Sequence, residues 1–562
     1  MKKKLAVALG CLTFGVSALA GCGPVGPGGG GTSVDKTKTQ LTVANYDGGV
    51  GSEWFRVVKA NFEEKYAETS FEPGKMGVQI VADIGKADHL SQISTDSYNV
   101  IFGESVDVNS MIAAGEILDI TDIVTTTGED GKTIESKLST DQKAALSVYG
   151  GKYYALPHYE YYPGLTYDKQ LFNEKSLYIA DDGSYTDASG SLSAGPDGKS
   201  GTFDDGLPAT VEQFIALCRH MRDSENVAPF MYSGQMPSYT DVILEALAVS
   251  LQSEDEFMLN FTFDSSKGGT LSGDDLVKTN VISGWNGTTP VVESVTVTPE
   301  TGYLTSQQVA KYYALQTLQT IANDTDTFIS SEVSSSVDHL GSQRKFVFSS
   351  LKNEEPVAML VEGSFWYNEA KTSNAHSDSV SQYGSRAKNR DFGWMPMPTA
   401  MSGVVDESNG RAFKLVDEAN SYAVINANIK NDPVKVQLAK LFLQYCYTDQ
   451  NLELFTKHTG CWKAVDYDIS NGIYDGLDNF YQSIADIRRA NGVVRPLSGN
   501  AIYTNNQLAF MFMRTYYFKT PKYACAFTVF KNGSATAKDF IEGMKETQST
   551  WTSKYSNYFN AN

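Results

Sequence analysis

Tyrosine side chains are crowded between Tyr149 and Phe172, where the chain reads YGGKYYALPHYEYYPGLTYDKQLF. The whole chain has only six histidines, and it contains neither a G-x-S-x-G elbow nor an H-E-x-x-H motif. Tyrosine combines an apolar ring with a hydroxyl that forms hydrogen bonds, which suits a ligand with apolar faces and polar rims. The segment therefore predicts a site that binds a ligand rather than one that performs catalysis.

Short apolar runs alternate with helical patterns before this segment. We predict strands over 41–44, 78–81 and 100–102, a helix from about residue 52, and a helix over 108–114. Alternation of this kind indicates an α/β lobe with a largely parallel sheet. In such sheets ligands bind beyond the carboxyl ends of the strands, so the loops that follow these strands are candidate ligand contacts.

Later parts of the chain carry helix-start signals. Thr210 with Gln213 three residues on forms a capping box, and Asp432 followed by Pro433 caps and begins another helix. Residues 250–305 are rich in Ser, Thr, Gly and Asp, and we predict an irregular insertion there.

The N-terminus predicts export. Residues 1–4 are basic, and residues 5–19 form an apolar stretch too short to span a bilayer as an ordinary helix. It ends in L-A-G-C at Cys22, which resembles the bacterial lipobox, so we expect residues 1–21 to be a lipoprotein signal peptide and Cys22 to be lipidated. An ordinary secretory signal with an incidental cysteine is the alternative. Residues 22–40 then form the lipidated cysteine and a flexible glycine-rich tether.

Composition limits the partners. The formal net charge is -20, and removing the three lysines of residues 1–21 makes it -23. So acidic a chain is repelled by phosphate backbones, and we expect no nucleic-acid partner. No later segment is apolar for long enough to cross a membrane. About 520 residues follow the tether, which is too many for one compact core, so two or more lobes are expected.

Four cysteines remain in the mature chain beside Cys22. They are far apart and show no C-x-x-C metal or redox spacing. A disulfide between Cys446 and Cys461 is conceivable in an oxidising location, but buried free thiols are the favoured state.

A series of segments resembles one known family, the extracellular solute-binding lipoproteins of ABC importers, in the branch that includes maltose-binding proteins. The first is GGKYYALP followed by LTYDKQLF, similar to the family's G-K-x-Y-x-x-P…Y-N/D-K-x-x-F segment. The second is AMLVEGSFW, similar to its A-M-x-x-x-G-x-W element. The others lie at 421–424, 439–445 and 533–543, so the resemblance extends over nearly all of 41–545.

The resemblance implies a periplasmic-binding-protein-like α/β fold, in which two lobes joined by a hinge close over a solute in an interlobe ligand cleft. Lobe one would take 41–155 plus 415–465, and lobe two would take 156–414 plus 466–562. The tyrosine segment would then be the first crossing of the hinge.

Strand alternation selects candidate ligand residues in that crossing. After the proline at 157, Tyr159 and Tyr161 share one face of an extended segment, and Glu160 lies on the other. We favour Tyr159 and Tyr161 for the cleft, with Glu160 as the second choice. The alternative is that these tyrosines only fill the core of the hinge.

Other candidates come from the resemblance and from strand ends. Trp366 matches the family's stacking aromatic, with a core tryptophan as the alternative, and Glu362 precedes it. Asp47 and Gly49 lie between a strand and a helix N-terminus, where backbone N–H groups are free, but the spacing is not that of a nucleotide-binding P-loop. Glu104 resembles a position where relatives hold sugar hydroxyls. The weaker aromatic candidates are Trp394, Tyr422 and Trp462.

One loop crowds carboxylates between glycines. Asp197, Asp204 and Asp205 lie within GPDGKSGTFDDG, and hard oxygen ligands at short spacing suit calcium. The pattern is not an EF-hand, and a solvated acidic turn is the alternative. Calcium here would be structural, and no other cofactor is required.

The resemblance implies a function in transport. The protein would be a monomer, held on the extracellular face of the cell membrane by its lipid anchor, that captures a carbohydrate, expected to be an oligosaccharide. It would deliver this solute to the transmembrane permease subunits of an ABC importer. The alternatives are the same fold binding a peptide, a polyamine or a modified sugar, a surface glycoside hydrolase with two carboxylates, and an adhesive lipoprotein.

Overall fold

The computed structural model describes residues 34–85, 87–105, 107–351, 355–372, 375–388, 390–405, 413–510, 520, 523 and 525–560. The predicted signal peptide, Cys22 and the tether up to residue 33 lie outside the described residues. Within these ranges, no helix is both long and apolar enough to span a bilayer.

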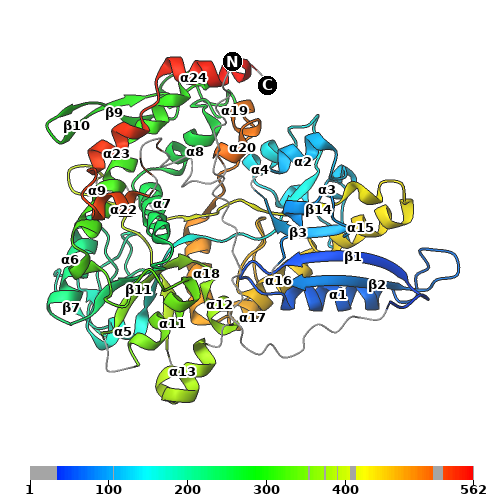
Figure 1. Ribbon diagram of the computed structural model, residues 1–562, viewed down its shortest axis with the longest axis horizontal. Helices are drawn as coiled ribbons and strands as arrows, with labels where there is room; N and C mark the ends of the chain where they lie inside the picture. Colours follow the sequence, from blue (N-terminus) through cyan, green and yellow to red (C-terminus); the bar gives the residue numbers. More distant parts are fainter. Residues whose placement is uncertain are drawn as a thin grey trace, which may run out of the picture.

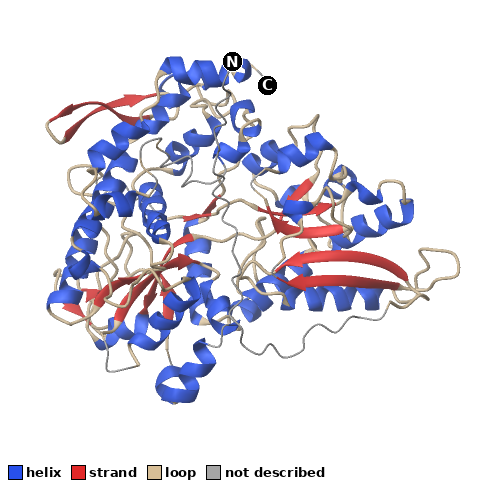
Figure 2. Cartoon of the chain, in the orientation of Figure 1, coloured by secondary structure: helices blue, strands red, loops and turns tan. Residues whose placement is uncertain are grey.

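The first of two main sheets has the strand order β2-β1-β3-β14-β4 (Figures 1 and 2). We call the unit built on it lobe one. One face of the sheet packs against α1, α15 and α16, and the other face packs against α2. The bounds are β1 Thr39–Tyr46, β2 Val78–Gly85, β3 Val100–Glu104, β4 Ala155–Pro157, β14 Ser421–Ile425, α1 Glu53–Lys65, α2 Val108–Ala114, α3 Thr121–Thr125, α4 Thr140–Leu146, α15 Pro433–Tyr445 and α16 Asp449–Thr459.

The predicted strands and helices of lobe one are confirmed, and four of the five strands run in the same direction, as expected for a largely parallel sheet, but β14 runs against them. β1 runs parallel to β2 and β3, whereas β14 runs antiparallel to β3 and β4. The reason is the path of the chain. β14 enters from the other lobe at the edge where the carboxyl ends of β1 and β3 lie, so it must run in the opposite direction.

The second main sheet has the order β12-β5-β11-β8 and is the centre of lobe two. β11 pairs parallel with β8 and antiparallel with β5, so this sheet is mixed as well. Its elements are β5 Pro163–Asp168, β8 Ala228–Met231, β11 Val357–Gly363, β12 Phe392–Trp394, α5 Lys169–Glu174, α6 Val211–Asp223, α7 Asp241–Ser250, α9 Val309–Asn323, α10 Thr325–Phe328, α11 His339–Ser349, α12 Trp366–Thr372, α13 Ala375–Tyr383, α14 Ser385–Lys388, α17 Asn471–Tyr474 and α18 Asn479–Asn491.

The predicted helix starts are also confirmed. The hydroxyl of Thr210 accepts from the N–H of Gln213, and the Gln213 side chain bonds back to the N–H of Thr210 (3.1 Å each), which forms the capping box of α6. Asp432 caps α15, which begins at Pro433.

The prediction of an irregular insertion over 250–305 is wrong. This stretch contains α8 Glu254–Thr262 and a hairpin of β9 Thr279–Asn286 and β10 Thr289–Val295, which projects from lobe two at the upper left of Figure 1. Gly287 has φ +65° in the tight turn after Asn286. An Asn-Gly pair between runs of β-branched residues is a strong hairpin signal, and it outweighs the polar composition.

The remaining described elements lie toward the C-terminus or are short. They are α19 Ala501–Thr504, α20 Gln507–Phe510, α22 Ala526–Lys531, α23 Ala537–Met544, α24 Gln548–Tyr555, β6 Tyr178–Ile179, β7 Tyr185–Thr186, β13 Leu415–Val416 and β15 Val493–Val494. The carbonyl of Thr504 accepts from the Asn109 amide of α2 (2.9 Å), so this part of the chain also contacts lobe one.

Crossing segments lie side by side between the lobes. The backbone N–H of Glu160 donates to the carbonyl of Trp462 (3.0 Å), and β13 pairs with β15. Tyr161 joins these two pairs, because its N–H donates to the Asp417 carboxylate (3.2 Å) and its carbonyl accepts from the N–H of Glu418 (3.3 Å).

The prediction of free thiols is confirmed. Cys218, Cys446 and Cys461 are buried free cysteines, and Cys525 is a half-buried one. No disulfide joins Cys446 to Cys461.

Candidate ligand site between the lobes

The carboxyl ends of β1 and β3 lie against the tyrosine segment on the side of lobe one that faces lobe two. Tyr46 ends β1 and Glu104 ends β3. The hydroxyl of Tyr159 donates to the Glu104 carboxylate. Gly48 has φ +55°, and a Cβ there would lie 2.1 Å from the Tyr159 hydroxyl oxygen, so only glycine allows the β1–α1 loop to approach this tyrosine.

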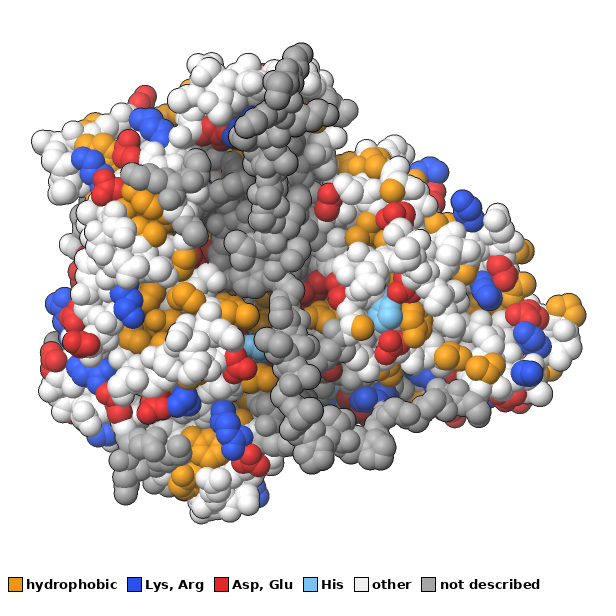
Figure 3. Space-filling model, viewed as in Figure 1, with side chains coloured by type: hydrophobic (Ala, Val, Ile, Leu, Met, Phe, Trp, Pro, Cys, Tyr) orange, Lys and Arg blue, Asp and Glu red, His pale blue; other side chains and the backbone are white. Residues whose placement is uncertain are grey.

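Lobe two reaches the same place through the loop after β11. The ring of Phe365 lies 5.3 Å from the ring of Tyr161, edge to face. Gly49 packs against the same ring, because a Cβ there would lie 2.8 Å from Cδ2 of Phe365 and 3.1 Å from Oε1 of Glu369. Figure 3 shows acidic and basic side chains scattered over the described surface of both lobes on this face of the molecule. We call Tyr46, Asp88, Glu104, Tyr159, Tyr161, Phe365 and Glu369 the interlobe cluster.

The lobes also touch through one amide beside this cluster. Asn368 of α12 donates to the carbonyl of Val50 (3.0 Å) and to that of Thr459, both in lobe one. One side chain of lobe two, that of Asn368, therefore helps to hold the two lobes together by donating to two backbone carbonyls of lobe one.

The carboxylates of the interlobe cluster are held in unfavourable surroundings. Burial raises the pKa of Glu104 to about 7, against the hydrogen bond from Tyr159, and the charges of Asp88 and Glu418 add to the rise. Burial likewise raises the pKa of Asp88 to about 6, although the N–H groups of Leu90 and Glu104 partly offset the effect. Burial and the Glu104 charge also raise the pKa of the Tyr46 hydroxyl.

The predicted alternation along the crossing segment is present in the structure. Tyr159 and Tyr161 contact Glu104 and Phe365, whereas Glu160 and Tyr162 contact a different set of groups. Tyr161 stays half-buried, and its hydroxyl accepts from the Asn420 amide (3.1 Å). Contact of these tyrosines with a ligand stays a prediction.

Glu160 is the centre of a buried ionic network. Its carboxylate pairs with Arg488 and with Nε of Arg495 (3.2 Å), and it accepts from the hydroxyl of Tyr162 (2.6 Å). Arg495 also pairs with Asp466 (2.7 Å). All of these partners of the Glu160 carboxylate belong to the protein itself. We therefore assign Glu160 a structural role in the hinge.

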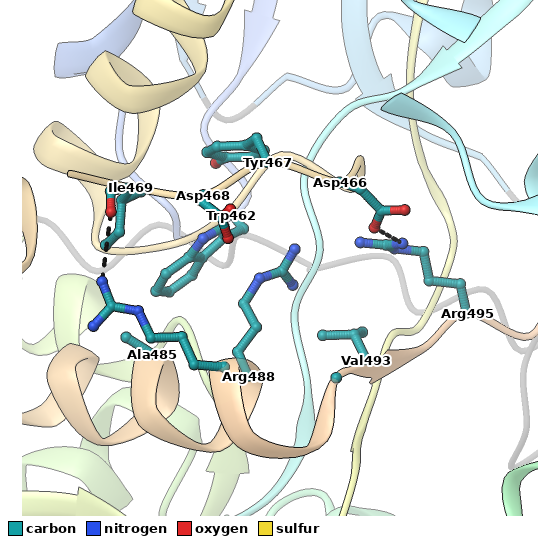
Figure 4. Close-up of a pocket in the computed structure, with 11 residues that line it drawn as sticks. Trp462, Asp466, Tyr467, Asp468, Ile469, Ala485, Arg488, Val493 and Arg495 are labelled. Atoms are coloured by element: carbon teal, nitrogen blue, oxygen red, sulfur yellow. Dashed lines mark hydrogen bonds and ion pairs between the residues drawn. The ribbon is translucent and has the colours of Figure 1, made fainter. Parts of the chain in front are cut away.

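A pocket of about 190 Å³ borders this network (Figure 4). Its walls include Trp462, and the guanidinium of Arg488 lies 5.3 Å from the ring of this tryptophan. Arg489 and Arg495 also line it, and they bond to the carbonyl of Ile469 (3.5 Å) and to Asp466. The predicted candidate Trp462 thus lies at this pocket and not in the interlobe cluster.

A second buried ionisable group, Lys463, lies at the lobe-one end of the hinge. Nζ of Lys463 lies 2.8 Å from Nδ1 of His158 and 4.5 Å from the ring centroid of Trp54. Burial lowers the pKa of Lys463 to about 7, and burial together with the Lys463 charge lowers the pKa of His158 well below its usual range.

Trp366 lies in the core of lobe two. It is 0% exposed and packs edge-on against Phe346, Phe392 and Phe480. It is the first residue of α12, and the helix turns it inward, whereas the preceding Phe365 is half-buried and contacts Tyr161. Phe365 was not among the predicted site residues, and the only sequence signal for it is its place directly after the G-x of the AMLVEGSFW element.

The other predicted residues divide between the cluster and the core. Gly49 belongs to the contact with Phe365, and Asp47 caps its own turn through the N–H of Gly51 (3.1 Å). Glu362, at the end of β11, accepts from Gln343, whose amide also donates to Glu369 (2.8 Å). Two aromatic candidates are core residues: Trp394 packs on Gly164, and Tyr422 packs with the α2 side of lobe one.

The acidic loop of lobe two satisfies its own carboxylates. Asp204 accepts from the N–H of Asp197 (2.8 Å) and the hydroxyl of Thr202 (2.7 Å), and Asp205 accepts from the N–H of Gly201 (2.7 Å). Burial raises the pKa of Asp204 to about 6. Among the residues that the structure describes, no group of three or more potential metal ligands lies together. Calcium binding stays a prediction.

Comparison with solved structures identifies a similar fold. A protein described as a chitin oligosaccharide binding protein is similar with a TM-score of 0.50 at 12% identity, over 92% of this chain and 99% of that one. The binding protein MsmE of Bacillus subtilis subsp. subtilis strain 168, in an open conformation, gives a TM-score of 0.47 at 11% identity, over 93% and 99%. The chain therefore has the two-lobed fold of a solute-binding protein. No family model and no curated protein sequence matches it.

Proposed function

We propose that this protein is the substrate-binding lipoprotein of an ABC importer and that it captures an oligosaccharide between its lobes. The observation that carries the proposal is the meeting of Tyr161 from the crossing segment with Phe365 from lobe two, beside the Tyr159–Glu104 hydrogen bond of lobe one. Aromatic faces next to hydroxyl and carboxylate groups suit sugars, whose rings have apolar faces and hydroxyl rims.

The mechanism follows from the placement of the cluster on both lobes. A ligand that contacts Phe365 and Glu104 together binds the closed arrangement more tightly than an open one, so it shifts the population toward closure. Contacts between the lobes, such as that of Asn368 with Val50, would then stabilise the closed state further. The closed form would be the one recognised by permease subunits.

Two further points support the proposal without deciding the ligand. The similar structure with the higher TM-score is described as binding chitin oligosaccharides. The L-A-G-C sequence at Cys22 supports a lipid anchor at the membrane, from which the glycine-rich tether would hold the lobes clear of the surface.

The test is a thermal-unfolding screen of the full chain in mild detergent against neutral oligosaccharides, peptides and calcium chloride. A ligand that binds only the folded state stabilises it by about 2.7 kcal/mol at 100 times its dissociation constant. We expect the unfolding midpoint to rise with one class of oligosaccharide, with no product formed overnight. A response to peptides with silence from every sugar would contradict the proposed ligand class, and product formation would indicate an enzyme.

A further inference from the structure

The carboxylates of lobe one in the interlobe cluster lack a cationic partner. Among the described residues, no lysine or arginine side chain pairs with Glu104 or Asp88. Glu104 accepts from the Tyr159 hydroxyl, and the charges that act on it come from Asp88 and Glu418, which are of the same sign. In the described part of the chain, Asp88 accepts from the backbone N–H groups of Leu90 (3.1 Å) and Glu104, and the positive charge that acts on it is that of His89, whose ring nitrogens are already paired with Asp83 and Asp96.

Other buried carboxylates of the chain are neutralised differently. Asp168, which is 0% exposed, pairs with Arg390 at 2.5 Å. Glu160, 1% exposed, pairs with Arg488 and Arg495. These two buried carboxylates each have a guanidinium partner, whereas Glu104 and Asp88 have none among the residues that the structure describes.

A second, independent observation lies beside these carboxylates. Asn420 is 4% exposed, and its Nδ2 donates to the hydroxyl of Tyr161 (3.1 Å), which places the side chain at the cluster. Its Oδ1 is buried and has no hydrogen-bond partner among the described residues. The carbonyl of Asn420 accepts from the N–H of Ser105 (2.8 Å), so this residue is a direct neighbour of the end of β3. A buried acceptor without a donor is costly, and it indicates a missing group that carries hydrogen.

We propose that the interlobe cluster binds a carbohydrate that carries a protonated amine, with the ammonium held by Glu104, Asp88 and the Asn420 Oδ1 and with a sugar ring against Tyr161 and Phe365. The inference rests on the proposed function and specifies its ligand. An ammonium donates up to three hydrogen bonds and carries the charge that two neighbouring carboxylates need. Aromatic faces attract the same cation.

A neutral sugar fits this site less well. Its hydroxyls would donate to Glu104 and Asp88 but would leave both negative charges unbalanced at the interface between the lobes. A free polyamine offers the ammonium but has no ring to lie against Tyr161 and Phe365. An amino sugar satisfies both the carboxylates and the aromatic rings.

The experiment is isothermal titration of the full chain in mild detergent with three probes: an oligomer of glucosamine, the same oligomer fully N-acetylated, and spermidine. We expect the glucosamine oligomer to bind at least about tenfold more tightly than the acetylated one, with a difference that shrinks at high salt. The Glu104→Gln variant should lose this preference, because its affinity for the glucosamine oligomer should fall much further than its affinity for the acetylated oligomer. Glu293→Gln, on the exposed β10 strand, removes the same charge elsewhere and should keep the preference.

The other outcomes separate the two proposals. If the acetylated oligomer or another neutral oligosaccharide binds as tightly, or if the preference survives in Glu104→Gln, the inference is overturned and the proposed function stands. If no sugar binds, whether or not spermidine does, both are overturned. If Glu104→Gln does not fold, as judged by its unfolding midpoint, Asp88→Asn makes the same test.

Discussion

The two sides of the crossing segment 158–162 treat negative charge in opposite ways. On one side Glu160 is paired with Arg488 and Arg495 and accepts from a tyrosine hydroxyl. On the other side Glu104 accepts from the hydroxyl of Tyr159, and its charged neighbours are carboxylates. Both carboxylates accept a hydrogen bond from a tyrosine of the same segment, and they differ in whether a described lysine or arginine side chain pairs with them.

The difference separates the hinge from the candidate site. A buried ion pair that the protein completes by itself holds the crossing segments together, and it leaves nothing for a ligand to supply. A pair of carboxylates without a cation destabilises the empty protein, and a cationic ligand would relieve this cost. Residues one position apart in the chain thus serve stability and binding, and four predictions test this division.

The largest effect is expected at the paired side. Glu160→Gln leaves Arg488 and Arg495 without their buried carboxylate, and breaking such a pair costs about 3–5 kcal/mol of unfolding free energy. Urea unfolding measures it. Glu53→Gln, which removes an exposed pair with Arg56, is the control and should cost about 0–1 kcal/mol. Equal losses in the two variants would contradict a structural role for the Glu160 network.

Neighbouring aromatic residues should separate stability from binding in the same way. Trp366→Ala removes a fully buried ring and should cost about 3–5 kcal/mol of unfolding free energy. Phe365→Ala removes a half-buried ring and should cost less stability, but it should weaken binding of the oligosaccharide about tenfold, or about 1.4 kcal/mol. Unfolding curves and calorimetry on both variants decide it. Unchanged affinity in Phe365→Ala would remove this residue from the site.

A smaller loss of stability is expected when the close contact between the β1–α1 loop and Tyr159 is disturbed. Gly48→Ala places a methyl group on the Tyr159 hydroxyl at a residue with φ +55°, and we expect a loss of about 1–3 kcal/mol in unfolding free energy with weaker ligand binding. Gly51→Ala also has positive φ (+87°) but meets no atom within 4 Å, so it measures backbone strain alone. If the two variants behave alike, contact with Tyr159 is not what requires glycine at 48.

The smallest effect is a pH dependence at the unpaired side. Because the pKa of Glu104 is raised from 4.5 to about 7 in the folded protein, the folded state binds the proton more tightly between these values. Stability should therefore fall as pH rises through this window, by about 1–2 kcal/mol after allowance for solvent screening of a partly exposed group. Thermal unfolding of the ligand-free wild type and Glu104→Gln across the window measures it. Parallel profiles would show that Glu104 does not titrate there.

Local patterns predicted much of lobe one. The strands β1 to β3 and the start of α1 follow from short apolar runs and steps of three and four, and the starts of α6 and α15 follow from their caps. The alternation of Tyr159 with Glu160 was also readable, because it depends on consecutive residues alone. The Asn286–Gly287 turn was equally readable, and the polar composition around it obscured the hairpin.

The parts that could not be predicted depend on residues far apart in the chain. The balance of charge at Glu160 requires Arg488 and Arg495, more than 300 positions away, and nothing near residue 160 indicates them. The motif around Trp366 was found, but its aromatic position, counted from Ala358, falls on Phe365, so the spacing already favours Phe365 over Trp366. The antiparallel entry of β14 likewise depends on the path of the chain between the lobes.

Two adjacent tyrosines offer the most direct test of the central claim that the interface between the lobes binds an oligosaccharide. Tyr161→Phe removes the hydroxyl bonded to Asn420, and Tyr162→Phe removes the hydroxyl bonded to Glu160. Titration calorimetry with the oligosaccharide found in the screen should show weaker binding in Tyr161→Phe, about fivefold to tenfold for one lost hydrogen bond, and unchanged binding in Tyr162→Phe. Equal affinities in the wild type and Tyr161→Phe, with a loss in Tyr162→Phe, would place the ligand on the opposite side of the crossing segment and contradict the account.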